Sequence, residues 1–99
     1  MFMTVTYDCT NDKRRNRVAK ILLDYGYRVQ YSVFEVELDK RRFEEMHGRL
    51  LEAIDESEDS IRIYRICERC LVQTQIHGSP WVDKPRAIVH NMIALEGGL

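Results

Sequence analysis

The sequence lacks a surplus of charge, a cysteine framework and any long apolar run. Its 15 basic and 16 acidic residues give a formal net charge of -1 over 99 residues, so total charge does not indicate a polyanionic partner. Three cysteines are an odd number and do not suit the disulfide framework of a small secreted domain. No apolar run approaches the roughly 20 residues of a membrane span, and the N-terminus has no secretory signal pattern. We therefore expect a cytoplasmic protein without membrane contact.

Familiar catalytic fingerprints are missing as well. The sequence has no nucleophile elbow, no phosphate-binding P-loop, no dinucleotide-binding glycine pattern and no internal repeat. What is present is the length of one domain, with 44% hydrophobic and 31% charged residues, as in a folded globular unit. A chain this short buries only a modest core, which favours a dimer.

Hydrophobic periodicity predicts a strand and then a helix at the start of the chain. Residues 2–7 alternate as a strand does, with one face more apolar than the other. Apolar residues at helical spacing predict a helix over roughly 12–25, capped by Asn11 or Asp12. Gly26 follows, where a left-handed glycine often ends a helix.

The middle of the chain predicts further strand structure and a second helix. Residues 27–38 are rich in β-branched and aromatic side chains, which indicates two short strands with a break near Tyr31-Ser32 or one long bent strand. Asp39 caps a helix to about Ile54, and residues 55–59 form an acidic loop that we expect to be a solvated connector. The expected buried face of this helix consists of Phe43, Met46, His47, Leu50, Leu51 and Ile54.

Strands over 60–66 and 71–76, with a weaker strand signal at 87–89, complete the pattern. Because both helices are amphipathic on one face, the order predicts an α+β fold with both helices on one side of the sheet. We expect a ferredoxin-like βαββαβ sandwich with an extra C-terminal strand. We divide the chain into a core at 1–78 and a C-terminal extension at 79–99, which contains a strand exchanged in the dimer and a frayed tail.

Cys67 and Cys70 form a lone C-x-x-C motif. Structural zinc needs four ligands, and no second cysteine pair exists. Thioredoxin-like chemistry places the motif at a helix start after a strand, whereas the predicted pattern puts it between two strands. A structural role is therefore favoured.

Asp8 interrupts strand propensity at the end of the first apolar run. A carboxylate beside a loop and a helix start is a recurrent place for site chemistry, although Asp8 could equally serve as a turn former or cap. One carboxylate is a poor metal site, because Mg²⁺ usually takes one or two carboxylates together with waters and phosphate oxygens. Asp8 is therefore expected as a metal ligand chiefly in a symmetric dimer.

Basic residues gather around the start of the first predicted helix, between positions 12 and 28, where only Asp12 and Asp24 offset them. Cations at a helix N-terminus oppose the macrodipole, which indicates an anionic ligand such as phosphate. The alternative is a solvated helix face. The predicted phosphate contacts are Arg14, Arg15, Arg17, Lys20 and Arg28.

Several segments together resemble the CRISPR-associated protein 2 family, in order over most of residues 1–66. They are Tyr7-Asp8, Asp12-Lys13-Arg14-Arg15, Val18-Ala19-Lys20, Tyr25-Gly26-Tyr27-Arg28-Val29-Gln30-Tyr31-Ser32-Val33-Phe34-Glu35 and Ile61-Arg62-Ile63-Tyr64. The resemblance implies a ferredoxin-like fold, a symmetric homodimer and a divalent cation, expected to be Mg²⁺, held by Asp8 of both subunits.

The same resemblance implies a function in CRISPR adaptation as part of antiviral defence. It implies metal-dependent endonuclease cleavage of RNA or DNA, and a place as the central dimer between integrase subunits during spacer acquisition. Tyr7, Arg15, Arg28 and Phe34 are expected to support Asp8 in substrate and loop geometry. Two alternatives remain: a non-catalytic DNA-binding scaffold for the integrase, and a toxin-like RNase on the same fold.

Overall fold

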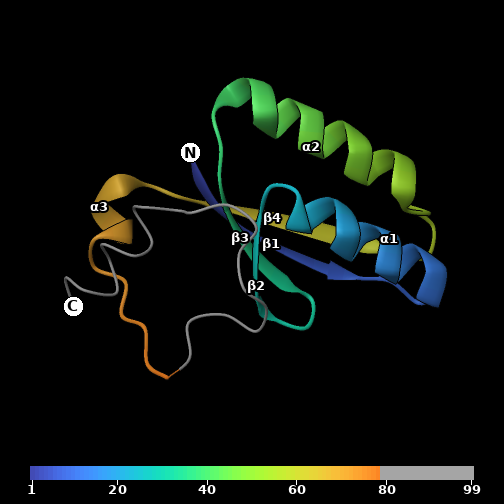
Figure 1. The fold of residues 1–99 in the computed structure, drawn as a ribbon, viewed down its shortest axis with the longest axis horizontal. Helices are drawn as coiled ribbons and strands as arrows, with labels where there is room; N and C mark the ends of the chain where they lie inside the picture. The colour runs from blue at the N-terminus through green and yellow to red at the C-terminus, as the bar shows by residue number, and fades with distance from the viewer. Residues whose placement is uncertain (79–99) are drawn as a thin grey trace.

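The computed structural model describes residues 1–78. Its elements are β1 (Phe2–Asp8), α1 (Asp12–Leu23), β2 (Gly26–Gln30), β3 (Val33–Glu37), α2 (Lys40–Ala53), β4 (Ser60–Ile66) and the short α3 (Glu68–Leu71) (Figure 1). Four strands form one sheet in the order β2-β3-β1-β4, and every neighbouring pair is antiparallel. The order βαββαβ with β1 at the centre confirms the predicted ferredoxin-like α+β class.

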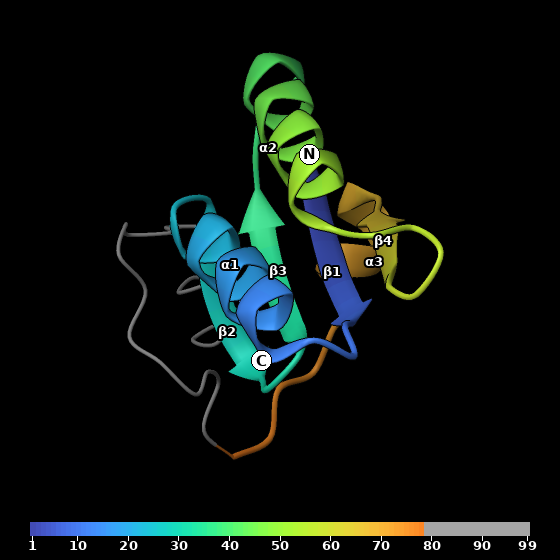
Figure 2. The ribbon, with the colours of Figure 1, turned by 90° about the vertical axis from the view of Figure 1, so that its right-hand side faces the viewer.

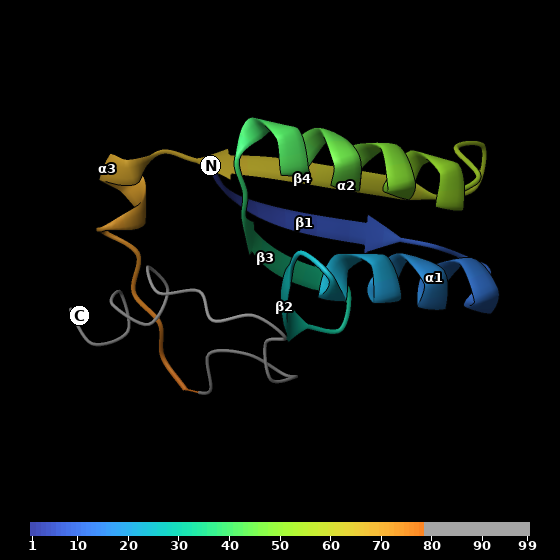
Figure 3. The ribbon, with the colours of Figure 1, turned by 45° about the horizontal axis from the view of Figure 1, so that its top comes forward.

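The helices α1 and α2 cover one face of this sheet (Figures 2 and 3). The core lies between them and the sheet, because alternate residues of β1 and β3 point toward the helices. Met3 and Val5 of β1 and Phe34 and Val36 of β3 are all buried there. The buried helical residues are Val18, Ala19, Ile21 and Leu22 of α1 and Met46, Leu50 and Ala53 of α2.

Residues 27–37 form two strands, β2 and β3, with the break at Tyr31-Ser32, so the first of the two alternatives is right. The prediction of Gly26 as a left-handed cap is wrong, since Asp24 caps α1 and Gly26 has no positive φ. Gly26 begins β2, where an added Cβ would lie 2.1 Å from the carbonyl oxygen of Glu35. A side chain is therefore excluded by the close approach of β2 to β3.

The buried face of α2 is narrower than its sequence predicts. His47 and Leu51 were expected in the core, but both are exposed, and Leu51 retains 44% of its accessible surface. His47 stacks on Phe43, with ring centroids 5.5 Å apart. Both exposed residues lie at the edge of the apolar stripe, and α2 packs on the sheet along one side only.

The predicted strand at 71–76 is also wrong. After β4 the chain forms α3, with helical bonds from the amides of Leu71 and Val72 to the carbonyls of Cys67 and Glu68. The C-x-x-C motif therefore lies at a helix start after a strand, where Cys67 is the N-cap, and not between two strands. The exchanged strand expected at 87–89 lies outside the described residues. Among the described helices, none is long and apolar enough to cross a membrane.

Candidate functional site

Asp8 is the last residue of β1 and is exposed. It pairs in register with Ser60, the first residue of β4, so the sheet ends at these two residues. The loop that follows leads directly into α1, whose N-cap Asn11 accepts a hydrogen bond from the amide of Arg14 at 3.0 Å. A carboxylate is thus held at the junction of sheet, loop and helix start, as the sequence predicts.

A cleft of about 410 Å³ opens beside Asp8. Four of the five predicted catalytic residues line it, and the fifth, Phe34, lies beneath Arg28, whose guanidinium carbon is 5.2 Å from the ring centroid. The structure therefore brings all five together. The residues that line the cleft are Tyr7, Asp8, Cys9, Arg15, Asn16, Ala19, Arg28, Tyr31 and Ser32.

Tyr7 joins the end of β1 to the turn between β2 and β3. Its hydroxyl donates a hydrogen bond to the carbonyl oxygen of Tyr31 at 3.1 Å, and its ring lies 6.2 Å from that of Phe34. Burial raises the pKa of the Tyr7 hydroxyl, which favours the protonated, donating form. Tyr31 itself is 86% exposed at the mouth of the cleft.

The peptide group between Cys9 and Thr10 is held on both sides. Its carbonyl accepts a hydrogen bond from Nη1 of Arg15 at 3.1 Å, and its N–H donates to Oδ1 of Asp59 at 3.3 Å. Arg15 also forms an ion pair with Asp12. Burial raises the pKa of the Cys9 thiol, which keeps this neighbour of Asp8 in its neutral form.

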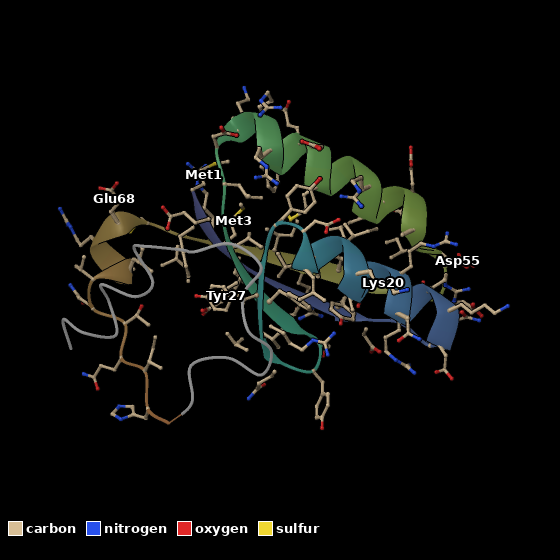
Figure 4. The ribbon with its side chains drawn as sticks, in the orientation of Figure 1. Met1, Met3, Lys20, Tyr27, Asp55 and Glu68 are labelled. Carbon is tan, nitrogen blue, oxygen red and sulfur yellow. The ribbon has the colours of Figure 1, made fainter. Side chains whose placement is uncertain are left out.

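Asp59 contradicts the prediction that residues 55–59 are only a solvated connector. It is 7% exposed, and its carboxylate accepts hydrogen bonds from Nε of Arg14 at 2.6 Å and from the amide of Asp55 at 2.9 Å. Figure 4 shows Asp55 just beyond the end of α2. The guanidinium of Arg14 holds the pKa of Asp59 below its usual range. The sequence pattern did not predict this role, because a run of acidic residues is typical of an exposed loop. The available signal was the position of Asp59 directly before a strand.

The predicted phosphate-binding residues form two groups: one forms ion pairs with nearby carboxylates, and the other lies in the cleft or on the exposed surface of α1. Arg14 forms ion pairs with Asp59 and with Glu58, the latter at 3.0 Å, and its side chain is 24% exposed. Arg15 is bound to Asp12 and the loop, as above. The second group consists of Arg28 in the cleft and of Arg17 and Lys20, which are exposed on α1. Figure 4 shows Lys20 on this helix.

Asp8 is the one carboxylate among the described residues that line the cleft, so it is the residue there that could hold a hard divalent cation. Within residues 1–78, no three His, Cys, Asp or Glu side chains gather to hold a metal, so one chain offers Asp8 and no complete cage. Mg²⁺ is commonly bound by one or two carboxylates, with waters and substrate phosphates completing its shell. An exposed Asp8 beside a polar cleft fits this kind of site.

Comparison with known proteins gives the same family from sequence and structure. Residues 1–74 match the family described as CRISPR associated protein Cas2. A CRISPR-associated endoribonuclease Cas2 from Chloroflexus aurantiacus is 46% identical over 78 residues, 79% of this chain and 84% of the relative. Another, from Synechocystis, is 43% identical over 86 residues, covering 86% of this chain and 94% of the relative.

Solved structures resemble the fold at similar identity. The crystal structure of Streptococcus pyogenes Cas2 has a TM-score of 0.69 and 38% identity, and the match covers 79% of this chain and all of that one (100%). A chain of a structure titled as a partial Cas6-RT-Cas1--Cas2 complex has a TM-score of 0.67 and 31% identity, covering 89% of this chain and 97% of that one.

Proposed function

The chain belongs to the CRISPR-associated protein Cas2 family, and from this membership and the geometry of the Asp8 cleft we propose that it acts in CRISPR adaptation as an endonuclease. In this proposal a homodimer in the cytoplasm binds nucleic-acid backbone and cleaves RNA or DNA phosphodiesters with Mg²⁺ at paired Asp8 carboxylates. The observation that carries the proposal is the convergence of Tyr7, Asp8, Arg15 and Arg28 on one cleft. Relatives named as endoribonucleases support the reaction class.

Each side chain of the cleft has a defined part. Asp8 would hold the cation, which when bound supplies Lewis-acid polarisation of the phosphoryl oxygen and a more acidic water. Arg28 lines the cleft with its guanidinium over Phe34, a position from which a cation can neutralise phosphate charge. Arg15 holds the loop after Asp8 through the carbonyl of Cys9. Tyr7 holds the opposite wall through the turn at Tyr31.

The proposed homodimer would bring two exposed Asp8 carboxylates together. Two Asp8 carboxylates about 5 Å apart across a two-fold axis would repel by about 3 kcal/mol at an effective dielectric near 20. A shared divalent cation removes this repulsion, which gives the pair a reason to bind metal. The sheet face opposite the helices can supply the contact: Tyr64, in register with Thr4, is 52% exposed there.

A second role as a scaffold is favoured by one comparison. A chain within a complex titled with both Cas1 and Cas2 resembles this one over 89% of its length. We propose that the same dimer binds the integrase subunit and holds duplex DNA by its backbone. In a purely scaffolding protein Asp8 would have no catalytic part.

The proposal is tested with purified protein on defined RNA and DNA, single- and double-stranded, with Mg²⁺ and with chelator. Asp8→Asn keeps the shape of the side chain and removes its charge, while Glu44→Gln makes the same charge change at an exposed site on α2. We expect Mg²⁺-dependent cleavage by the wild type and by Glu44→Gln, and none by Asp8→Asn. Undiminished cleavage by Asp8→Asn would refute the site. Binding without cleavage by the wild type would favour the scaffold.

A further inference from the structure

We infer that Asp59 is a positioning residue for Asp8, because its buried carboxylate sets the orientation of the Cys9–Thr10 peptide in the loop directly after Asp8. The inference rests on the proposed function, since it concerns how the proposed metal ligand is presented. Asp59 lies in the segment between α2 and β4 and does not line the cleft, whose lining residues come from β1, the loop after it, α1, β2 and the turn after β2.

The argument starts from the peptide between Cys9 and Thr10. Asp59 accepts from its N–H at 3.3 Å, and Arg15 donates to its carbonyl at 3.1 Å, so both polar groups of one peptide plane are bound. Rotation of that plane would break one bond or the other. Because the backbone has only two soft dihedrals per residue, restraint of this plane limits the directions available to Asp8 one residue earlier.

Asp59 is itself anchored from three segments. Its two oxygens accept from Nε and Nη2 of Arg14 at 2.6 and 3.2 Å, from the amide of Asp55 at 2.9 Å, and from Thr10. The next residue, Ser60, pairs in register with Asp8. One carboxylate thus ties the first turn of α1 and the segment just after α2 to the loop that follows Asp8.

These contacts also separate Asp59 from a ligand role. Its side chain has 0% exposure and four N–H donors on its two oxygens, which leaves no open position for a cation. Asp8 is exposed on the neighbouring strand end. Partners that orient a metal ligand without touching the metal change affinity by about 10–100-fold when they are removed. We expect the same order of effect here.

The test measures Tb³⁺ binding to the purified full chain by luminescence sensitised by the protein's tyrosines, one of which, Tyr7, precedes Asp8. Asp59→Asn keeps the size of the side chain but replaces one acceptor oxygen with an NH₂ group that faces N–H donors. Asp24→Asn is the matched control, because Asp24, the C-cap residue of α1, forms an exposed ion pair with Arg49 at 3.2 Å. Asp8→Asn defines the signal that comes from the site.

We expect Asp8→Asn to abolish the site signal, Asp59→Asn to weaken Tb³⁺ affinity at least tenfold in protein that remains folded, and Asp24→Asn to change it less than twofold. Full affinity in Asp59→Asn, with the signal lost in Asp8→Asn, would overturn the positioning role and leave the proposed function intact. A signal that persists in Asp8→Asn would overturn both.

Amide hydrogen exchange in the wild type gives a second readout that holds even where Asp59→Asn does not fold. Thr10 is an exposed residue, so slow exchange of its amide depends on the bond to Asp59. We expect exchange at least tenfold slower than in an unstructured chain. An amide that exchanges at the unstructured rate would overturn the inference.

Discussion

Arg14 and Arg17 lie one turn apart on α1, yet the structure gives them different expected effects on nucleic-acid binding. Arg14 is held by Asp59 and Glu58, whereas Arg17 is exposed on the helix surface. Replacement of either by Ala removes one positive charge per protomer. Because Arg14→Ala also removes two donors from the buried carboxylate of Asp59, both variants are first shown to be folded. A difference between the folded variants then reports the position of the charge and not its loss alone.

The expected size follows from counterion release. If Arg17, Lys20 and Arg28 each contact one phosphate, a dimer neutralises about six phosphates, and the slope of log K against log salt is about -5 for duplex DNA. Arg17→Ala removes two contacts per dimer and should bring the slope to about -3.6. Arg14→Ala should leave the slope near its original value, because that guanidinium already has carboxylate partners.

Fluorescence anisotropy with labelled duplexes of unrelated sequence, at salt concentrations between roughly 50 and 200 mM, measures these slopes. Similar loss of affinity across sequences is expected for Arg17→Ala, since phosphate contacts carry no base information. Equal slopes for the wild type and Arg17→Ala would refute the reasoning and make the exposed cations of α1 a solvated face. A large drop in slope for Arg14→Ala would show that its ion pairs open on binding.

Three further predictions concern the glycines Gly26 and Gly48, the carboxylate of Asp59, and the C-x-x-C motif. Gly26→Ala should destabilise the protein by about 3 kcal/mol in chemical denaturation, because its Cβ would lie 2.1 Å from the carbonyl oxygen of Glu35. Gly48→Ala should stabilise it by about 1 kcal/mol, because nothing lies within 4 Å of the added Cβ. A Gly26→Ala protein more stable than Gly48→Ala would contradict the observed β2–β3 packing. Asp59 has a lowered pKa in the folded state, so its contribution to the free energy of unfolding is present at neutral pH and is lost as acid protonates it below about pH 4. The free energy of unfolding, measured against pH, should therefore fall less steeply below that pH in Asp59→Asn than in the wild type. The same pH profile in both proteins would refute the ion pair. Replacing Cys67 and Cys70 with Ser should leave nucleic-acid binding and any Mg²⁺-dependent cleavage intact, and stoichiometric zinc lost in the double variant would overturn this.

The strength of local patterns decided what could be predicted from the sequence. Strand alternation through Met3, Val5 and Tyr7, and the caps Asn11 and Asp39, are signals within a few residues, and the structure has them where expected. Local patterns do not predict the cleft, because Tyr7 and Asp8 lie on β1 and Arg28 lies on β2, and only the folded sheet brings these strands together. The expectation that the three residues act together came from the family resemblance.

The wrong predictions concern Gly26, Asp59 and residues 71–76. The prediction of Gly26 as a helix cap rests on the common use of glycine after a helix. The structure instead requires glycine there because β3 lies too close for a side chain, with Gly26 opposite Val36, ten residues later in the sequence. Asp59 was grouped with a solvated acid run, and its burial depends on Arg14, 45 residues away in the sequence. Residues 71–76 alternate like a strand, yet helical bonds form α3 from residue 68. Long-range partners override local propensity in the first two cases, and local helical bonds prevail in the third.

The most direct test of the central claim is the stoichiometry of Mn²⁺, a spectroscopic substitute for Mg²⁺, on the purified dimer by electron paramagnetic resonance. A cation shared by two Asp8 carboxylates predicts one Mn²⁺ per two chains, and no specific binding in Asp8→Asn. One Mn²⁺ per chain, or the same binding in Asp8→Asn as in the wild type, would contradict the paired site.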